Sequence, residues 1–515
     1  MILFIITLLP FVTLFVLLIA LRRPAHEAAP ISYAITVAIA FGVWQISGTV
    51  FAASLLDAIV VFVEVLLIVA VALMVLNVMI ETGALDTIKT SMARVTSDDR
   101  VLAMLLAWGL VGFVEGIAGF GTPAVLAAPV LVHFGFGPTK AVAVSLIGNS
   151  TAVPFGAAGT PVVIGFRGLD LTDDVVSSAV FMAAAIHAGM AILVTCIITY
   201  VVTTGMEKGR FRQFLPFAVF SALSFSLPYL AVAYFVGPEL PAIVGGASAI
   251  VAITLAASRG VMLPARGSSR DRAPEEKKGA PSSIMRSFAP FAVMALALIV
   301  SRTVPGLREA LQDVTVSFGE FRGLELDQEL SPLYTPYFYL AMALITTLLV
   351  FNVTRTTLRK AVAATYRRLR LASVVLIFII ALTQLLLWSE VNEAGLPSIP
   401  EVLGRGFADR LGGAFVVFSP FLGAIGSFMT GSATVANLLF AGLQKDSAEA
   451  LDSPVANFLA LQLVGAGVGN MISLSNIAMA AGAVGLEARE GKVMRLTGIP
   501  VIIVCLVAGL LFFTW

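Results

Sequence analysis

Glu115 is the residue in this sequence with the clearest capacity for chemistry, because its carboxyl is the one charged group in a long apolar run. A Gly-Phe-Gly-Thr-Pro segment follows it at 119–123. An ionised carboxylate near the centre of a bilayer costs about 2.5–3.5 kcal/mol on insertion scales, and the cost falls when the group takes up a proton or pairs with a cation. We therefore expect Glu115 to carry a proton or to bind an ion. The alternative is that Glu115 caps a short helix or hydrogen-bonds to a neighbouring Asn.

Small polar residues and glycines gather at four interruptions of the apolar runs. We expect them to bind a small polar anion and any coupling cation. Any single one could instead cap a half-helix or hydrogen-bond between helices, as small polar residues in membranes often do. Four such clusters in matched positions are harder to explain by packing. The candidates are Gly119, Phe120, Gly121, Thr122, Asn149, Ser150, Thr151, Thr160, Thr430, Gly431, Ser432, Thr434, Asn437, Asn470, Ser473, Ser475 and Asn476.

Interrupted helices would hold these clusters in place. Residues 115–161 look like two membrane helices that both stop in the middle of the bilayer, with breaks at 119–123 and 148–161. Free backbone N–H and C=O groups are tolerated at that depth only where they are buried in protein or line a wet cavity. A broken helix presents a positive N-terminal end and a negative C-terminal end, which suit anions and cations. Such an arrangement is typical of a transport site.

The composition indicates a polytopic membrane protein. The 515 residues are 59% hydrophobic and only 12% charged, whereas an ordinary soluble domain carries about 25% charged residues. Nothing in the composition supports nucleic-acid binding. Cys196 and Cys505 lie inside apolar runs, and the three histidines form no Cys/His cluster, so we expect neither a disulfide nor a metal site. Without a nucleophile–base motif we also expect no enzymatic activity, and no cofactor apart from a coupling ion, H⁺ or alternatively Na⁺.

The sequence predicts an all-α fold with about twelve membrane spans and two re-entrant hairpins. Apolar runs of about 20 residues are long enough to cross a bilayer. Residues 1–21 carry no basic residue before their apolar run, so we expect a retained helix rather than a signal peptide. The hairpins are predicted at about 101–135 and 412–444. The predicted spans are 2–21, 31–50, 57–80, 175–204, 213–236, 241–258, 286–304, 334–352, 371–388 and 494–513, with broken helices at about 140–166 and 454–486.

The charges of the loops orient these spans through the positive-inside rule. The basic loop 353–370, the linker 259–285 and loop 205–212 are expected in the cytoplasm, and the acidic loop 305–333 is expected outside. All four assignments agree when both termini lie outside. We therefore expect a multi-pass protein of the inner (plasma) membrane.

The second half of the chain repeats the theme of the first. The linker 259–285 separates residues 1–258 from 286–515, and each half holds a hairpin with a polar tip followed by a helix broken at a Gly/Asn/Ser cluster. In the second half the breaks fall at 426–434 and 465–476. By the loop charges, the two hairpins enter from opposite faces. This pattern predicts inverted-topology repeats that hold a substrate between them near the midplane.

Other ionisable residues fall in or near the predicted spans. Asp57 and Glu64 share a helix face, and we expect Asp57 to have a structural role or to lie at the interface and keep Glu64 as a weaker candidate for a proton path. His187 is expected to form a helix–helix hydrogen bond. No cation is expected at the midplane, so a carboxylate would be held by half-helix N-termini and by hydroxyl or amide donors. The cations expected to snorkel from helix ends to the interface are His133, Lys140, Arg167 and Arg302.

Several short motifs form a set that is found together elsewhere. They are Glu115-Gly116, Ala118 to Pro123, Asn149, Phe155-Gly156-Ala157 with Gly159 and Pro161, Gly237 to Pro241, Ser419 to Gly423, Thr430-Gly431-Ser432 and Met471-Ile472-Ser473. Together they resemble the L-lactate permease family, most specifically over 115–161. The resemblance implies a secondary transporter that carries lactate, glycolate or a similar 2-hydroxy monocarboxylate with protons. The family is similar to a wider group of ion transporters with inverted repeats and re-entrant hairpins, for which elevator-type motion is expected.

Two positions depart from the pattern of that family. Its members usually have an Asp where this chain has Ala433, and a Lys where it has Asn470. The joint loss of an acid and a base suggests that they form a pair in relatives. The substrate therefore stays open, and the alternative is a sodium-coupled carrier of another small organic anion, such as a sulfonate or dicarboxylate. A monomer and a homodimer are both compatible with the sequence.

Overall fold

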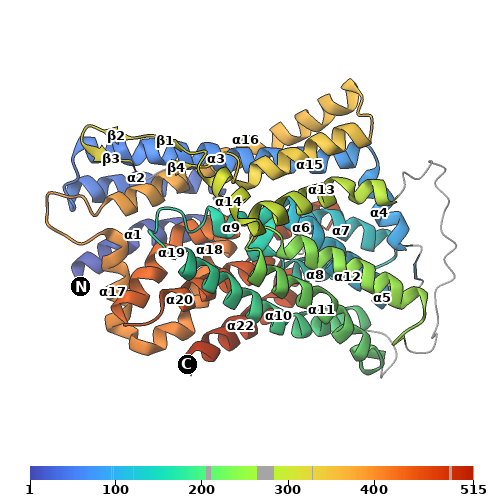
Figure 1. Cartoon of the computed structure of the whole chain (residues 1–515). Coiled ribbons are helices and arrows are strands. Elements are labelled where there is room, and N and C mark those ends of the chain that lie inside the picture. The colour runs from blue at the N-terminus through green and yellow to red at the C-terminus, as the bar shows by residue number, and fades with distance from the viewer. Residues whose placement is uncertain are drawn as a thin grey trace.

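A computed structural model describes residues 1–21, 23–93, 95–96, 98–119, 121–204, 210–263, 284–326, 329–486 and 490–513. These residues are mostly helical, and the two termini lie toward the same end of the molecule (Figure 1). Most of the linker predicted over 259–285 lies outside the described residues, and the division of the chain into two halves stays a prediction.

Before the linker the elements are, in chain order, α1 (Ile2–Phe15), the π-helix η1 (Val16–Ala20), α2 (Ala25–Gly42), α3 (Gly48–Glu81), α4 (Ala84–Ala93), α5 (Asp99–Ala103), the π-helix η2 (Met104–Leu110), α6 (Val111–Ala118), α7 (Thr122–His133), α8 (Pro138–Asn149), the 3₁₀ turn η3 (Val153–Phe155), α9 (Gly156–Val163), α10 (Asp173–Thr203), α11 (Arg210–Phe235) and α12 (Pro241–Ser258).

After the linker they are α13 (Ile284–Thr303), α14 (Pro305–Gln312), strands β1 (Val316–Ser317), β2 (Glu320–Phe321), β3 (Leu324–Glu325) and β4 (Glu329–Leu330), α15 (Pro336–Val350), α16 (Arg355–Trp388), α17 (Ile399–Leu411), the 3₁₀ turn η4 (Gly412–Ala414), α18 (Phe415–Thr430), α19 (Ala433–Ala450), α20 (Val455–Gly469), the 3₁₀ turn η5 (Asn470–Ile472), α21 (Leu474–Ala483) and α22 (Glu490–Phe513).

The helices of the described residues are those of a multi-pass membrane protein. Nine of them are long and apolar enough to cross a bilayer, or up to eleven if each of two bent pairs is one span. One bent pair is α8 with residues 153–163, at 59°, and the other lies within α16, which bends by 42° between Arg370 and Ala372. The predicted helical membrane fold is confirmed. The predicted count of about twelve spans, the re-entrant entry of the hairpins and the inverted repeats stay predictions.

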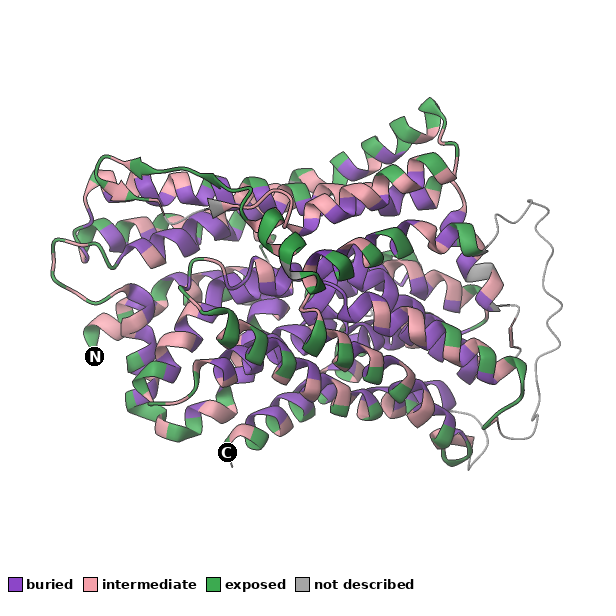
Figure 2. Cartoon of the chain, viewed as in Figure 1, coloured by how far each residue is buried: buried purple, intermediate pink, exposed green. Residues whose placement is uncertain are grey.

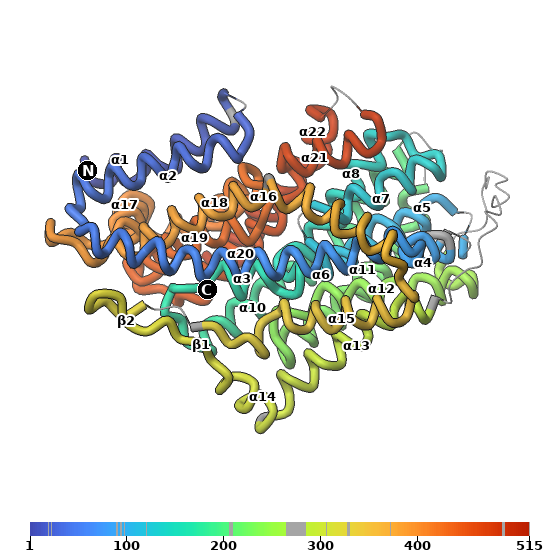
Figure 3. Tube along the Cα trace, turned by 90° about the horizontal axis from the view of Figure 1, so that it is seen from above, coloured from blue at the N-terminus to red at the C-terminus, as the bar shows by residue number. Residues whose placement is uncertain are grey.

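Long helices form one face of the molecule. Helices α3 and α16 pack along each other, α2 packs on α16, and α15 packs on α3 and α13. They form the upper layer in Figure 1, and the view from above shows α3 and α16 running side by side over the interior (Figure 3).

The interrupted helices occupy the centre of the fold. The whole of the span Asp99–Ala118 is buried inside the protein, and so is 83% of the span Val455–Ile472, whereas most outer helices bury half or less. Figure 2 shows this contrast between a buried interior and outer helices with one exposed face. The central segments are therefore enclosed by protein, as broken backbone at membrane depth requires.

Two predicted boundaries are wrong. The span predicted at 31–50 is divided, because α2 ends at Gly42 and α3 begins at Gly48. Between them Gln45 has a left-handed φ of 52°, and the Ser47 hydroxyl accepts a hydrogen bond from the Val50 N–H, which caps α3.

The second wrong boundary is the basic loop predicted at 353–370, which is helical and forms the first half of α16. Thr354 caps this helix by accepting from the Thr357 N–H at 3.2 Å. Residues 355–370 contain no Gly or Pro to stop it. The dense positive charge led to the prediction of a loop, but charge alone does not end a helix.

The acidic segment 305–333 contains α14 and two small hairpins. Strand β1 pairs with β4 in antiparallel register, Val316 opposite Leu330, and β2 pairs with β3, Phe321 opposite Leu324. The strands are two residues long, and Phe321 and Leu324 are partly buried against the core, whereas β1 is exposed.

Candidate functional site

The first hairpin turns at two glycines. Helix α6 ends at Ala118, Gly119 and Gly121 have left-handed φ values of 55° and 71°, and α7 begins at Thr122. Glycine adopts these values without the steric cost that a Cβ brings. Helix α7 then packs back against η2 and α6, so the segment forms a hairpin whose tip lies inside the protein. Phe120, a predicted site residue, lies outside the described residues.

Glu115 lies one turn before this tip and is 3% exposed. Asn149, at the end of α8, hydrogen-bonds to its carboxyl. The Glu115 Oε1 atom faces the start of α9, where a Cβ on Gly156 would lie only 2.5 Å from it. Within the described residues the Oε2 atom has no hydrogen-bond partner. The carboxyl is thus enclosed between the first hairpin and the first broken helix.

The first broken helix changes hand in its middle. After η3, residues Ala157, Ala158 and Gly159 have φ values of 45°, 52° and 77° before the chain resumes a right-handed helix. A Cβ on Gly159 would lie 2.8 Å from the carbonyl carbon and oxygen of Pro238. The loop before α12 is therefore packed directly against the left-handed turn and holds it in place.

The second hairpin turns at Gly431, which has a φ of 73° and ends α18. The Ser432 hydroxyl accepts from the Val435 N–H at 3.3 Å and caps α19. The Thr430 hydroxyl accepts from the Ser432 N–H at 3.2 Å. Two predicted site residues thus complete the local turn, which is the structural alternative considered for them above.

The second broken helix closes on the tip of the second hairpin. Asn470 Nδ2 donates to the Gly431 carbonyl at 3.2 Å, and Asn476 Nδ2 donates to the same carbonyl at 3.3 Å and to Asn470 Oδ1 at 2.7 Å. The Ser473 and Ser475 hydroxyls are 2.9 Å apart. Two amides from the second break therefore bond to the buried Gly431 carbonyl of the second tip, and the two serine hydroxyls lie beside the same glycine.

Asn476 also reaches the first hairpin. A Cβ on Gly121 would collide with the Asn476 side chain, and a Cβ on Gly431 would collide with Ser475. Helix α21 packs against α7 and α8. The structure therefore brings the first hairpin tip together with the second tip and the second break, which lie more than 300 residues later in the sequence.

Other predicted residues serve the backbone near the first break. Ser150 and Thr160 donate to carbonyls of their own segment, Ile147 O at 2.7 Å and Ala157 O at 2.5 Å. The carbonyl of Thr151 accepts from the Tyr229 hydroxyl at 2.9 Å. Thr434 is buried in the first turn of α19. These residues shape the breaks rather than lie at the meeting point of the tips.

A buried polar chain joins the second hairpin to the first broken helix. Ser419 donates to Gln444 at 2.8 Å, Gln444 to Gln462 at 3.1 Å, and Gln462 to Asn437 at 3.2 Å. Asn437 then donates to the Pro161 carbonyl at 2.8 Å. Asn437 was predicted as a binding residue, and its side chain instead links the two halves.

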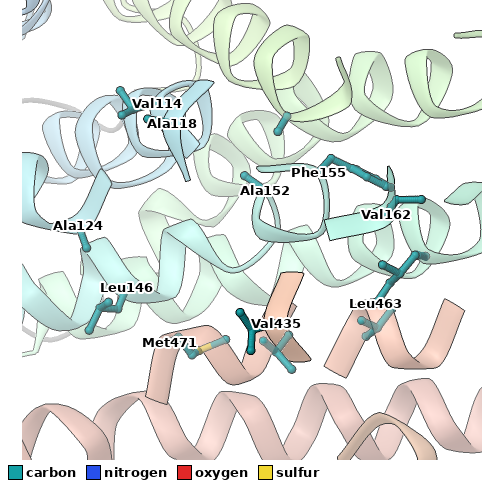
Figure 4. Close-up of a cluster of buried hydrophobic side chains, with 14 of the residues drawn as sticks. Val114, Ala118, Ala124, Leu146, Ala152, Phe155, Val162, Val435, Leu463 and Met471 are labelled. Atoms are coloured by element: carbon teal, nitrogen blue, oxygen red, sulfur yellow. The ribbon is translucent and has the colours of Figure 1, made fainter. Parts of the chain in front are cut away.

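Apolar contacts join the same segments. Ala152, Phe155 and Val162 of the first broken helix gather with Val435 of α19 and Leu463 of α20 in one buried cluster (Figure 4). The two halves therefore meet directly at their breaks.

Arg368 is the functional candidate that the sequence analysis missed. Its Nη1 atom lies 3.3 Å from the Thr122 hydroxyl at the tip of the first hairpin. A cation therefore lies beside one of the polar clusters, and the expectation that no cation lies at the midplane stays a prediction. Arg368 belongs to the run that was interpreted as a cytoplasmic loop, and no local signal links it to a residue 246 positions earlier.

The remaining charged groups lie away from the tips. Arg167 pairs with Glu64, and Arg302 Nη2 lies 2.7 Å from Glu239 Oε1. Both guanidinium groups are mostly buried, so the prediction that Arg167 and Arg302 snorkel is wrong. The Trp388 indole donates to Asp57 at 2.7 Å within the interior, which fits the structural role that was one of the two expectations for that carboxylate.

His187 and Lys140 each contact a neighbouring helix. His187 is 1% exposed, and its Nε2 atom lies against Gly467 of α20. Lys140 Nζ donates to the Thr204 carbonyl at 2.5 Å, which joins the start of α8 to the end of α10. Among the described residues, no group of three or more His, Cys, Asp or Glu side chains is arranged to hold a metal ion.

Comparison with known proteins decides the family. The family model described as L-lactate permease matches residues 3–515, nearly the whole chain. The chain belongs to the L-lactate permease family. The resemblance seen in the motifs around Glu115 is thereby confirmed, and the chain is a multi-pass membrane permease.

Individual members of the L-lactate permease family are similar over most of their length. A putative L-lactate permease of Haemophilus influenzae is 29% identical over 83% of this chain and 82% of its own. The glycolate permease GlcA of Escherichia coli is 24% identical over 96% and 92%, and the L-lactate permease of the same species is 26% identical over 84% and 80%. Among solved structures, the YdaH transporter of Alcanivorax borkumensis matches 87% of this chain and 84% of its own at 15% identity, with a TM-score of 0.41.

Proposed function

We propose that this permease carries lactate, glycolate or a similar small 2-hydroxy monocarboxylate together with a proton across the plasma membrane. Relatives named for lactate and for glycolate match most of the chain, which supports this substrate class. The two tips and the second break offer hydroxyl, amide and backbone donors at one place, which is the chemistry that a hydroxyl and a carboxylate on neighbouring carbons require.

The observation that carries the proposal is the position of Glu115. Its carboxyl is enclosed beside the first break, and it is the acidic residue closest in the chain to either tip. Within the described residues, Glu115 Oε2, Asn149 Oδ1, Thr151 Oγ1 and Ser427 Oγ are buried without a hydrogen-bond partner. Such groups cost free energy unless they are satisfied at some stage of the working cycle. A proton on Glu115 and a polar solute at the tips would satisfy them.

The test is uptake of labelled lactate by proteoliposomes that hold the purified protein. An inside-alkaline pH gradient should drive accumulation, and a sodium gradient without a pH gradient should not. Glu115→Gln should abolish accumulation on the pH gradient and keep counterflow, because the amide preserves the shape and the contact with Asn149 but carries no exchangeable charge. Glu449→Gln, on a surface ion pair with Lys445, is the matched control and should behave as the parent protein.

Either of two results would overturn the proposal. If Glu115→Gln still concentrates lactate on a pH gradient, Glu115 does not carry the proton. If only the sodium gradient drives uptake, or if sulfonates or dicarboxylates outcompete lactate and glycolate, the chain is the sodium-coupled carrier of another anion that the sequence left open.

A further inference from the structure

Arg368 presents a positive charge to the tip of the first hairpin. Its Nη1 atom lies 3.3 Å from the Thr122 hydroxyl, and Thr122 is 2% exposed at the start of α7. Arg368 itself is exposed at the surface of the packed core. The guanidinium group therefore lies at the boundary between the buried tip and the space beyond it.

This charge is not used in an ion pair. Three arginines have mostly buried side chains, unlike Arg368, and each of them lies against a carboxylate: Arg100, Arg167 and Arg302. Within the described residues, no carboxylate oxygen lies within 4.0 Å of the Arg368 nitrogens. A guanidinium carries five N–H donors, and one contact with a hydroxyl leaves most of them free.

The position of Arg368 is fixed by the helix that carries it. Thr365, three residues earlier on the same face of α16, accepts a 2.9 Å hydrogen bond from the buried Asn77 amide of α3. Helices α3 and α16 pack closely along their length. Arg368 is therefore held over the tip by a defined helix contact.

The surroundings of Thr122 favour negative charge. Thr122 opens α7, and the N-terminal end of a helix carries the positive end of its dipole. The nearby second break contributes the Ser475 hydroxyl beside Gly431, whereas Asn476 turns its Oδ1 atom toward Gly121 and uses its amide N–H groups within the second break. Glu115, the acidic residue of this hairpin, directs its Oε1 atom between Gly156 and Gly119.

We propose that Arg368 binds the carboxylate of the transported anion, pairing with it beside the N-terminus of α7. This inference rests on the proposed function, since it names the residue that recognises the acid group of that substrate. A guanidinium binds a carboxylate through two parallel N–H···O bonds, and an ammonium group cannot reproduce this geometry. Arg368 is therefore a determinant of specificity for carboxylates over neutral analogues.

The experiment compares Arg368→Gln with Arg367→Gln in proteoliposomes. Arg367 is the matched control, because it directly precedes Arg368 on the same helix and is also exposed. It lines a separate cavity of about 510 Å³ with Glu81 and Lys360. Loss of a paired, charge-assisted contact should raise the KM for lactate by about 10- to 100-fold in Arg368→Gln. Arg367→Gln should leave KM unchanged, and Arg368→Lys should recover only part of the loss.

Selectivity separates a binding role from a structural one. Competition by lactamide, the neutral amide of lactate, should be weak in the parent protein, and Arg368→Gln should lose most of the preference for lactate over lactamide. An arginine that only supports the fold would change both affinities in parallel. If KM and the lactate–lactamide ratio of Arg368→Gln equal those of the parent, the inference is wrong while the proposed function stands. If the parent protein takes up no hydroxy acid, the proposed function has failed, and the same ratio measured with the anion that it does carry decides the role of Arg368.

Discussion

The Asn437 side chain donates a 2.8 Å hydrogen bond to the backbone carbonyl of Pro161, joining two residues 276 positions apart. Asn437 lies in the second hairpin and Pro161 in the first broken helix, so this bond connects the two halves of the chain directly. Both groups are buried, and each needs the other because water does not reach them.

Asn437→Ala should destabilise the protein markedly. The change leaves the Pro161 carbonyl and one Gln462 N–H without a partner, at about 1–3 kcal/mol for each buried group. The measurement is the thermal unfolding midpoint of the purified protein. Thr346→Ala is the control, because that hydroxyl only bonds to Met342 O in its own helix, and its midpoint should stay close to that of the parent. Equal midpoints for both variants would show that the link between the halves contributes nothing.

Arg167→Gln should be among the most damaging changes outside the tips. It leaves the Glu64 carboxylate, which is 1% exposed, without its cation. Removing one partner of a buried ion pair costs about 3–5 kcal/mol. The double variant with Glu64→Gln removes both charges and should recover part of the lost unfolding midpoint. A double variant less stable than Arg167→Gln alone contradicts this explanation.

Exchanging the charges of Glu239 and Arg302 should fail to restore stability. Besides the ion pair, Arg302 donates to the Tyr334 carbonyl at 2.6 Å, and its guanidinium carbon lies 3.4 Å from the centre of the Tyr334 ring. A carboxylate at position 302 would face that carbonyl and the negative face of the ring. We expect the thermal unfolding midpoint of the exchanged protein to be no higher than that of Arg302→Glu alone. Recovery of the parent midpoint would mean that only the ion pair matters.

Gly159→Ala should impair folding much more than Gly485→Ala. Both glycines have left-handed φ values, 77° and 65°, so an added Cβ costs about 1–2 kcal/mol of backbone strain at each. At Gly159 the new atom would also lie 2.8 Å from the Pro238 backbone, whereas at Gly485 it would meet nothing within 4 Å. Comparing expression and unfolding midpoints isolates the contact with Pro238. Similar losses of stability at both glycines would show that backbone strain from the left-handed φ, and not the contact with Pro238, accounts for the effect.

Restoring the family residues tests the departures at Ala433 and Asn470. Both positions are 4% exposed, and the Asn470 amide donates to Gly431 O, two residues before Ala433. Ala433→Asp or Asn470→Lys alone buries one charge and should lower the unfolding midpoint and uptake. The double variant places opposite charges together and should be more stable than either single variant. If it is the least stable of the three, the two positions are not a pair.

The breaks could be predicted from sequence because their cause is local. Glycines accept the left-handed φ seen at 119, 121 and 431, and residues such as Ser432 cap a helix start, so clusters of such residues favour a break. The hairpin tips and both broken helices accordingly lie within the predicted ranges. What joins them is not local, and neither the contact of Asn476 with Gly121 nor the bond from Asn437 to Pro161 has a signal in either segment alone.

Arg368, which the sequence analysis missed, shows the same limit of prediction from local sequence. The arginines of 355–370 were interpreted as a loop because the positive-inside rule counts charges without regard to helix faces. In the structure the segment is a helix, with Arg367 at one cavity and Arg368 at the tip. Only the packing of α16 on α3 distinguishes these neighbours, and that packing depends on residues such as Asn77, almost 300 positions away.

The buried chain from Ser419 through Gln444, Gln462 and Asn437 to the Pro161 carbonyl has a mechanical consequence. Each of its bonds is made between segments that lie on different helices, and breaking any of them inside the interior leaves a polar group stranded. Moving these segments together as a rigid unit therefore costs less free energy than sliding one past the other. A displacement of the first broken helix would carry the second hairpin with it. If the tips hold the transported anion, as proposed, the anion would move together with both segments. The energy barrier to transport would then depend on the contacts that these joined segments make with the rest of the protein.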